Sequence, residues 1–279
     1  MPRFAANLSL MYTDRPFLER FAAAAEDGFR AVEYLFPYAH NPQEIAARLQ
    51  AHGLQQVLFN TPPGGLQAAD CQQAWDRGDR GTACVPGRQA EFRAGLQAAL
   101  DCAQVLGCPR LHCMVGLRAA DTPPAQADDV LCENLLWASQ QAAQVGCELL
   151  IEPINTRSVP GFHLNRQDHA HALVQRVGAA NLKVQMDLFH CQIVEGDLSH
   201  KLATYLPSGR VGHIQIADVP DRHEPGSGEV HWPHVFALID RLSAQTGWSG
   251  HVGCEYTPAD STPGGTSRGL AWLRRLGPC

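Results

Sequence analysis

The chain has few charged residues and no excess of positive charge. Asp, Glu, Lys and Arg make up only 18% of its 279 residues, and 22 Lys and Arg stand against 28 Asp and Glu, a formal net charge of −6. Such a balance gives no electrostatic attraction to nucleic acid or to an anionic membrane surface. Hydrophobic residues make up 45%, which supplies a large core and excludes a disordered chain. We therefore expect a globular protein that binds neither nucleic acid nor membrane.

Long apolar runs and paired cysteines are also missing. No uninterrupted apolar stretch is long enough to span a bilayer, and residues 1–7 enter a strand-like segment without the apolar part of a signal peptide. The ten cysteines include no C-x-x-C pair, and three fall in apolar strand-like segments. This pattern favours reduced thiols over disulfides or a zinc-thiolate site, and it predicts a cytoplasmic protein. The cysteines are Cys71, Cys84, Cys102, Cys108, Cys113, Cys132, Cys147, Cys191, Cys254 and Cys279.

Short apolar runs of strand length recur along the whole chain, and each is followed by a helix-like stretch. Six helical stretches end in glycine, which suits the left-handed residue that often terminates a helix before the next strand. Asn41-Pro42 predicts a helix cap followed by proline at the first helical position. The expected strands are 3–8, 30–35, 55–60, 110–115, 147–152, 182–187, 210–216 and 250–256, and the glycines are Gly28, Gly53, Gly107, Gly146, Gly178 and Gly247.

Eight strands that alternate with helices predict a parallel sheet covered by helices, because the strands are continuously apolar. A closed (β/α)8 TIM barrel fits this length as a single domain over residues 1–279, and a doubly wound open sheet is the alternative. No glycine-rich dinucleotide motif follows the first strand, which argues against a Rossmann fold. Two long segments without a regular pattern, 61–88 and 217–231, follow the third and seventh strands, at the end of a barrel where active sites are built.

Polar side chains stand at the ends of the last four expected strands. Glu152 and Asp187 end the fifth and sixth strands, and Gln215 and Glu255 lie near the ends of the seventh and eighth. Adjacent strand ends converge on a barrel axis, so the three carboxylates would repel one another without a compensating cation. Three carboxylates and an amide oxygen, with no thiolate, favour Mg²⁺ or Mn²⁺. Any one of them alone is equally well explained as a solvated rim residue, but four on consecutive strands favour a shared metal site.

Several histidines lie near this predicted site or on neighbouring elements. His190 lies just past the sixth strand, where it can reach over the site as a hydrogen-bond donor. His213 shares a strand face with Gln215, so we expect it one layer deeper, as a hydrogen-bonded core residue. His169 and His171 lie two apart on a predicted helix, where they cannot share a face. We expect both of them at the surface.

Sequence blocks along essentially the whole chain match one family pattern, in order. The most specific are His213 to Asp218 (HIQIAD), running into Arg222 to Gly226 (RHEPG) and Gly228-Glu229, and Gly253 to Tyr256 (GCEY). The other blocks are Phe59-Asn60 with Pro62, Arg77-Gly78 with Arg80-Gly81, Pro86 to Arg88, Ile151 to Arg157, Pro160 to Phe162 with Leu164 to Arg166, and Asp187 with His190. Together these blocks resemble the hydroxypyruvate isomerase family, one of the xylose-isomerase-like barrels.

The resemblance implies a metal held at the ends of strands five to eight and a pair of glutamates that act as acid and base. These roles map onto Glu152 and Glu255, with Asp187 and Gln215 as further metal ligands. The implied reaction is an aldose-ketose type of isomerisation. It interconverts hydroxypyruvate and tartronate semialdehyde (2-hydroxy-3-oxopropanoate) by metal-assisted proton transfer through an enediolate. A close relative that isomerises 2-oxo-tetronates shares these motifs, so the choice of substrate stays open.

An acidic substrate also needs a positive partner in the protein. One divalent cation against three carboxylates leaves a charge of roughly −1, and arginine suits a carboxylate because it pairs through two hydrogen bonds. Two arginines lie in rim loops and two in the long third loop, which we expect to close over the site and exclude water. The alternative is that these arginines only brace carboxylates of their own loops. The predicted substrate-binding residues are Asn60, Arg80, Arg88, Arg157, His190 and Arg222.

Two other functions use the same kind of barrel. A ketose 3-epimerase performs the same proton transfer on a neutral sugar. A metal-dependent endonuclease needs several metal ions, further histidine ligands and a basic DNA-binding face, and the acidic balance and Gln215 in place of a histidine argue against it. We therefore expect a small hydroxy- or oxo-acid as the binding partner. Whether the protein forms a homo-oligomer stays open.

Overall fold

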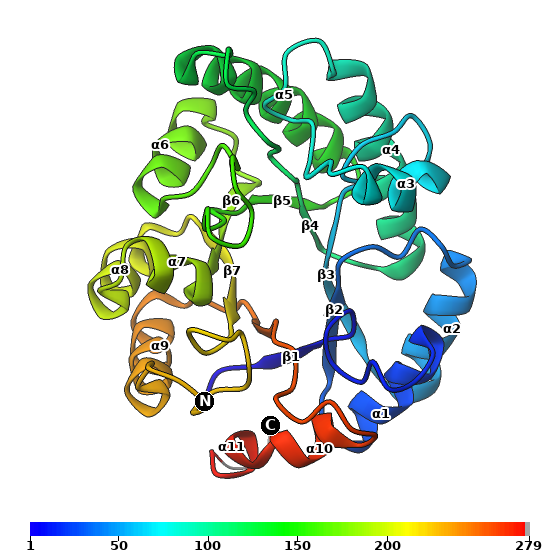
Figure 1. The fold of residues 1–279 in the computed structure, drawn as a ribbon, viewed down its shortest axis with the longest axis vertical. Helices are drawn as coiled ribbons and strands as arrows, with labels where there is room; N and C mark the ends of the chain where they lie inside the picture. Colours follow the sequence, from blue (N-terminus) through cyan, green and yellow to red (C-terminus); the bar gives the residue numbers. More distant parts are fainter. Residues whose placement is uncertain (277–279) are drawn as a thin grey trace.

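The computed structural model describes residues 1–276 as a closed barrel of eight parallel strands in chain order. β1 pairs with β8 in parallel, with Phe4 beside Val252, and this pairing closes the barrel. Figure 1 shows the strands at the centre and the helices around them. The predicted (β/α)8 barrel is confirmed. Its strands are β1 (Phe4–Asn7), β2 (Ala31–Tyr34), β3 (Gln55–Asn60), β4 (Arg110–His112), β5 (Glu148–Ile151), β6 (Leu182–Asp187), β7 (Val211–Ile216) and β8 (Val252–Cys254).

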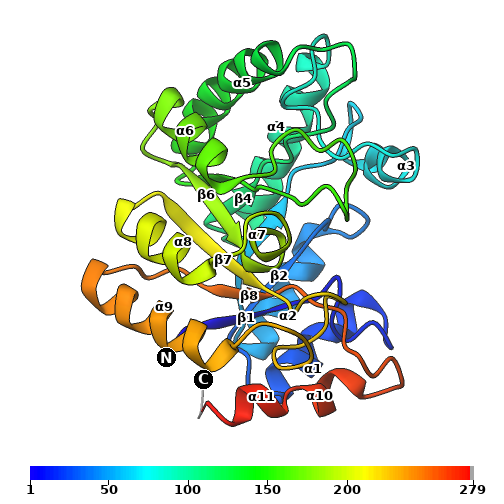
Figure 2. The same cartoon turned by 60° about the vertical axis from the view of Figure 1, so that its left-hand side comes forward.

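Helices cover the outside of the barrel and connect one strand to the next (Figures 1 and 2). The helices are α1 (Arg20–Glu26), α2 (Pro42–His52), α3 (Cys71–Asp76), α4 (Gln89–Leu106), α5 (Pro124–Gln144), α6 (Gln167–Val177), α7 (Leu188–Val194), α8 (Leu198–Tyr205), α9 (Trp232–Thr246), α10 (Gly265–Gly269) and α11 (Ala271–Arg274). Short 3₁₀ helices cover Phe17–Glu19, Ala68–Asp70 and Leu206–Ser208.

Local sequence sets the helix boundaries as expected. The side chain of Asn41 accepts a hydrogen bond from the backbone N–H of Gln43 at 2.9 Å, and Pro42 is the first residue of α2. This is the predicted cap. All six predicted glycines have positive φ angles: Gly28, Gly53, Gly107, Gly146, Gly178 and Gly247.

The inside of the barrel has an apolar layer followed by a polar one. Ala5, Ala31, Val57, Leu58 and Leu150 form a small buried cluster apart from the main core. Side chains two residues further along a strand share its face, one layer nearer the carboxyl end. Asn7, Glu33 and Glu152 lie two residues after Ala5, Ala31 and Leu150, so they form this polar layer.

A glycine makes room for the polar layer. A Cβ atom on Gly253 of β8 would lie 2.2 Å from Oε2 of Glu33. Real side chains do not approach so closely, so a larger residue at this position would displace the Glu33 carboxylate. Gly253 is thus part of the reason why a carboxylate can sit inside the barrel.

Three expectations from the sequence were wrong. Segment 61–88 is not without regular structure, because it contains α3 and a 3₁₀ helix. Strands β4 and β8 are shorter than expected; beyond β4, Val115 pairs in an antiparallel bridge with Gly81 of the long segment instead of continuing the sheet. His171 is buried rather than at the surface, because its ring stacks on Tyr205 with 3.9 Å between the ring centres. His169 is half-buried.

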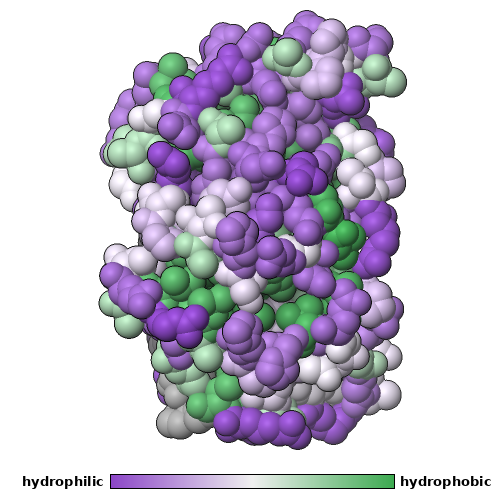
Figure 3. All heavy atoms as spheres, turned by 90° about the vertical axis from the view of Figure 1, so that its left-hand side faces the viewer, coloured by the Kyte–Doolittle hydropathy of each residue, from purple (hydrophilic) through white to green (hydrophobic). Residues whose placement is uncertain are grey.

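The outer surface is mostly hydrophilic. Figure 3 shows hydrophilic residues over most of the face on the side of α6, α8 and α9, with hydrophobic ones between them in small groups. Within residues 1–276, no helix is long and apolar enough to cross a membrane. The free thiols of Cys71, Cys84, Cys102, Cys108, Cys113, Cys147 and Cys191 are buried and that of Cys132 is half-buried, while Cys279 lies outside the described residues.

Candidate active site

Three acidic side chains meet at the carboxyl end of the barrel. Glu152 directly follows β5, Asp187 ends β6 and Glu255 directly follows β8, and all three are buried. The three carboxyl groups lie close enough together that the charges of Glu255 and Asp187 raise the pKa of Glu152. Arg222 lies beside two of them, with Nη2 2.7 Å from Glu255 Oε2 and 3.6 Å from Asp187 Oδ2. The structure thus brings together the three carboxylates that the sequence predicted to share a site.

The cluster lacks full electrostatic compensation. Burial raises the pKa of Glu152 well above its usual value, and the neighbouring carboxylates raise it further. Burial also raises the pKa of Glu255 to about 8, against the opposing effect of Arg222. Oε1 of Glu152 and Oδ2 of Asp187 are buried and have no hydrogen-bond partner within the described chain. Buried polar atoms are seldom left unsatisfied, so these oxygens fit a divalent cation that they would coordinate.

Asp187 links the end of β6 to the start of α7. Its Oδ1 accepts hydrogen bonds from the backbone N–H groups of Phe189 at 2.7 Å and His190 at 3.3 Å, which caps the helix. The cap fixes the carboxylate and leaves Oδ2 directed at the cluster. A strand that ends in aspartate and turns directly into a helix therefore positions both Asp187 and the histidine that follows it.

His190, in the first turn of α7, lies beside Asp187 and Glu152. Its Nε2 lies 3.6 Å from Asp187 Oδ2 and 3.9 Å from Glu152 Oε1, and the donor atoms of the three residues all lie within 4.8 Å of one another. Asn155 donates its Nδ2–H to Nδ1 of His190 at 2.5 Å, so Nε2 faces the carboxylates. Burial lowers the pKa of His190 to about 4, which keeps the ring neutral. Because Nδ1 accepts from Asn155, the neutral ring carries its proton on Nε2, so His190 suits the role of hydrogen-bond donor that the sequence predicted rather than that of a metal ligand.

Gln215 is oriented by a buried polar network. Its Nε2 donates to Oε1 of Glu33 at 2.8 Å, and its Oε1 accepts from Nε2 of Gln185 at 2.5 Å. His213 lies one layer deeper, completely buried, with Nε2 2.6 Å from Oε2 of Glu33. The expectation that His213 is a hydrogen-bonded core residue is confirmed. The role of Gln215 as a metal ligand stays a prediction.

Two buried residues of this end were not identified from the sequence. His112 ends β4, with Nδ1 3.6 Å from Glu152 Oε2 and 3.2 Å from Asn60 Oδ1. It was missed because the fourth strand was expected to run to residue 115, which placed His112 in mid-strand. Glu33 was missed inside an apolar strand run, although an acidic residue in such a run is itself a signal of a buried polar contact.

Two of the predicted arginines line the pocket beside the carboxylates. Arg222 reaches it from the β7–α9 loop, and Arg80 reaches it from the long segment after β3. The guanidinium carbon of Arg80 lies 3.7 Å from the centre of the Trp75 ring, and its Nη1 donates to the backbone oxygen of Trp75 at 3.0 Å. These contacts hold Arg80 at the pocket wall.

The other two arginines lie outside the pocket lining. Arg157 is exposed and donates to the backbone oxygen of Pro220 at 2.9 Å. Arg88 forms ion pairs with Asp79 at 2.7 Å and Glu91 at 2.6 Å. In this arrangement Arg88 braces the long segment, and Arg157 connects two rim loops.

The pocket itself has a volume of ≈ 80 Å³. Its lining combines acidic, imidazole and guanidinium groups with apolar side chains. The polar lining residues are Asn60, Arg80, His112, Glu152, His190, Arg222 and Glu255, and the apolar ones are Leu35, Trp75, Met114, Ile154, Val159 and Phe162.

Known proteins share this architecture over their full length. The xylose isomerase-like TIM barrel family model matches residues 21–276. A 2-oxo-tetronate isomerase from Cupriavidus necator is 52% identical over 274 residues, and a hydroxypyruvate isomerase from Escherichia coli is 40% identical over 273 residues; in both cases 98% of each chain is covered. A crystal structure of a Brucella melitensis protein described as an AP endonuclease of family 2 is 43% identical, covers 99% of each chain and has a TM-score of 0.89. Since the similarity to both isomerases extends over essentially the whole barrel, this chain belongs to the xylose isomerase-like TIM barrel family and is an isomerase.

Proposed function

We propose that this isomerase interconverts hydroxypyruvate and tartronate semialdehyde with the help of a divalent metal ion. The observation that carries the proposal is that two glutamates, Glu152 and Glu255, line the same small pocket. Glu152 follows β5 and Glu255 follows β8, and Asp187 at the end of β6 lies between them in strand order. Two full-length relatives named for the isomerisation of hydroxypyruvate or of 2-oxo-tetronate support it.

The reaction needs a base and an acid in one pocket. Removal of a proton from the CH2OH carbon of hydroxypyruvate gives an enediolate, and a proton returned to the neighbouring carbon, with transfer of the hydroxyl proton, gives the aldehyde. Glu152 and Glu255 are the two pocket carboxylates that can accept and return these protons. His190 is held by Asn155 with Nε2 toward the carboxylates, where it can orient a substrate oxygen.

Glu152, Asp187 and Glu255 would hold the metal, with His190 beside them and Gln215 as the further predicted ligand. The donor set is mostly hard oxygen, which favours Mg²⁺ or Mn²⁺. A cation bound there supplies positive charge that stabilises an enediolate. The unpartnered oxygens of Glu152 and Asp187 support this assignment, because coordination would satisfy both.

Arg222 and Arg80 support an acidic substrate. Both line the pocket. Arg222 is already paired with Glu255, whereas Arg80 has no carboxylate partner among the described residues, so the carboxylate of an acidic substrate would give it one. An arginine–carboxylate pair contributes about 1.5–3 kcal/mol, so one such contact favours the acid clearly. Arg222 is fixed for this role by its backbone N–H, which donates to the backbone oxygen of Asp218 at 3.0 Å, and by the ring of Phe189, 5.0 Å from its guanidinium carbon.

A 2-oxo-tetronate is the second candidate substrate, favoured by the 52% identity to the Cupriavidus necator enzyme. An endonuclease activity, as the description of the Brucella melitensis structure suggests, is disfavoured by the net charge of −6, since DNA binding needs a basic face. We therefore propose a cytoplasmic enzyme that acts on small molecules and binds neither nucleic acid nor membrane. The buried free thiols are consistent with a reducing compartment.

Turnover by the purified protein tests the proposal. Hydroxypyruvate, 2-oxo-tetronates and the neutral ketoses fructose and tagatose are compared before chelation, after it, and after Mg²⁺ or Mn²⁺ is returned. We expect turnover of an acid, loss of activity with the chelator and recovery with the metal. Faster turnover of a 2-oxo-tetronate selects the second candidate. A preference for a neutral ketose would reject the acid substrate and move the assignment to an epimerase.

A further inference from the structure

A second group of potential metal ligands lies outside the pocket, where the β5–α6 loop meets α5 and α6. It consists of Asp128 near the start of α5, His163 in the loop and His169 in the first turn of α6. Oδ1 of Asp128 is 2.7 Å from Nε2 of His163 and 2.9 Å from Nε2 of His169. The three donor atoms lie within 4.8 Å of one another. Three segments of the chain thus direct one ligand atom each at the same point.

Two of the three ligand-atom separations are close to those of a tetrahedral metal site. The two imidazole rings are nearly perpendicular, with an interplanar angle of 80°, and both direct Nε2 at one carboxylate oxygen. Ligand atoms around zinc lie about 3.3 Å apart, because zinc–nitrogen and zinc–oxygen bonds are about 2.0–2.2 Å long. The observed separations therefore need to widen by only about half an ångström. The side chain of His169 is 31% exposed, so it has room for this movement.

We propose that Asp128, His163 and His169 form a binding site for Zn²⁺ or a similar transition-metal ion, separate from the active site. Two imidazoles and one carboxylate are donors that zinc prefers, whereas the pocket offers mostly carboxylate oxygen. Three protein ligands leave one position for water, as in exchangeable zinc sites. Burial lowers the pKa of His163, and the neutral ring is the form that binds metals.

A metal ion here would restrain the wall of the active-site pocket. His163 directly follows Phe162, which lines that pocket. The backbone N–H of His163 donates to the oxygen of Gly116 at 3.1 Å, and Phe162 forms an antiparallel bridge with Leu117. The ion would cross-link the β5–α6 loop to α5 and α6. At this point the loop is already attached to the β4–α5 connection by the two backbone contacts just described. The site would thus stabilise the loop without contact with the substrate.

Zinc stoichiometry of the full chain tests the site. Metal-free wild type, His169→Gln and Asp128→Asn are equilibrated with ZnCl2, and the zinc retained per chain is measured by elemental analysis. We expect wild type to retain one more equivalent than either variant. His200→Gln is the matched control, because it removes an exposed histidine on α8 and should retain as much as wild type. Any zinc bound in the active site is common to all four proteins and cancels in the comparison.

Amide hydrogen exchange gives a second readout, which does not depend on the number of zinc ions retained per chain. Zinc should slow exchange at residues 161–164 in wild type and His200→Gln and leave it unchanged in His169→Gln. If wild type and both ligand variants retain equal amounts of zinc, the site is rejected and the three residues form only a hydrogen-bonded contact. An equal loss of zinc in His200→Gln would also overturn it, because the binding would then be unspecific.

Discussion

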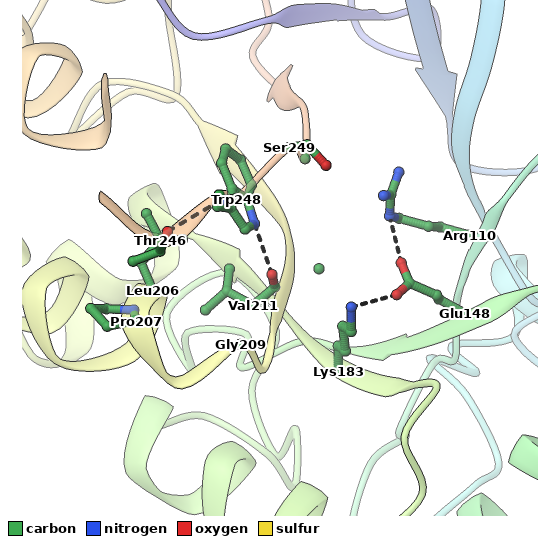
Figure 4. A pocket seen from close by; sticks show the side chains of 13 residues that line it. Arg110, Glu148, Lys183, Leu206, Pro207, Gly209, Val211, Thr246, Trp248 and Ser249 are labelled. Atoms are coloured by element: carbon green, nitrogen blue, oxygen red, sulfur yellow. Dashed lines mark hydrogen bonds and ion pairs between the residues drawn. The ribbon is translucent and has the colours of Figure 1, made fainter. Parts of the chain in front are cut away.

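The two ends of β5 carry glutamates in opposite electrostatic surroundings. Glu148 begins the strand and lies between two cations, 3.0 Å from Nε of Arg110 and 2.5 Å from Nζ of Lys183 (Figure 4). Glu152 follows the same strand at the other end of the barrel, buried among carboxylates and with one oxygen that lacks a hydrogen-bond partner in the described chain. One carboxylate is paired, and the other is ready to receive a ligand.

The larger of the two pockets is therefore not the better candidate site. A pocket beside Glu148 at the amino end has a volume of ≈ 300 Å³ against ≈ 80 Å³ at the carboxyl end. Its charged groups already have partners, since Glu148 is paired with both Arg110 and Lys183, and the indole N–H of Trp248 donates to the backbone oxygen of Val211 at 2.8 Å (Figure 4). The buried, unsatisfied carboxylate oxygens of Glu152 and Asp187, rather than pocket volume, distinguish the carboxyl end as the candidate site.

The largest contrast between the two ends should appear in turnover. Glu152→Gln and Glu255→Gln should each lower kcat by about 10² to 10⁴, because glutamine keeps the size and one oxygen donor but cannot accept and return a proton. Glu148→Gln is the matched control from the other end of the strand and should keep turnover near that of wild type. Initial rates on hydroxypyruvate measure all three.

Circular dichroism and bound metal must accompany these rates. A near-wild-type rate in Glu152→Gln or Glu255→Gln at unchanged metal content would show that the altered residue is neither acid nor base. A loss in Glu148→Gln as large as in Glu152→Gln would contradict the division of the barrel into a paired end and a reactive end.

The sequence predicted the carboxylate cluster because strand ends are its simplest signal. Glu152 and Asp187 each follow a run of apolar residues, and barrel geometry brings such ends together. His112 obeys the same rule, but the end of β4 is hidden in the sequence, since the apolar residues continue after the chain has left the sheet. The positions of Arg157 and Arg88 outside the pocket lining were not accessible either, because loop conformation depends on contacts between segments that are distant in sequence.

The next contrast is between arginines inside and outside the pocket. Arg80→Gln should raise KM for hydroxypyruvate by about 10-fold to 100-fold, which corresponds to the loss of about 1.5–3 kcal/mol of a charge-assisted contact. Arg157→Gln removes the same group from an exposed rim position and should change KM much less. Steady-state kinetics on the acid and on a neutral ketose measure both effects. Equal changes for the two substrates in Arg80→Gln would mean that Arg80 does not bind the carboxylate.

Acid stability should depend on a histidine at the amino end. His251 is buried, and burial, with the nearby charges of His213, Arg3 and Arg110, lowers its pKa to about 3. Below its ordinary pKa of about 6.5 the unfolded chain binds a proton that the folded protein excludes, so stability falls as the pH drops from 6.5 toward 3. Between pH 7 and pH 5 this difference amounts to about 1–2 kcal/mol.

His251→Gln removes the titrating group and should lose correspondingly less stability over that pH interval. Urea unfolding of both proteins at pH 7 and pH 5 gives the loss of unfolding free energy in each. The contributions of the other titrating groups are common to both proteins and cancel in the difference. Parallel losses in wild type and variant would show that His251 takes up its proton equally in both states.

The fold was more predictable than the site because it rests on repeated local signals. The glycines at 53, 107, 178 and 247 end helices in left-handed conformations, and Asn41 caps α2 through its own side chain. Each signal requires only its neighbours in the chain. His171 shows the limit: its burial against Tyr205 depends on the packing of α6 near α8, which no periodicity within one helix reveals.

The smallest expected effect is on the free energy of unfolding, through the ion pairs of Glu148 with Arg110 and Lys183 at the amino end. Glu148→Gln leaves the cations of Arg110 and Lys183 side by side, but the side chains are 16% to 26% exposed, and partly solvated ion pairs contribute about 1 kcal/mol or less. We expect a loss of that size in urea unfolding at low salt, and a smaller loss in about 1 M salt, where the Debye length falls to about 3 Å. Lys183→Met keeps the Arg110–Glu148 pair and should cost less than Glu148→Gln. A loss of several kcal/mol that salt does not reduce would mean that Glu148 acts as a buried charge, as Glu152 does, and the contrast between the two ends would then concern chemistry alone.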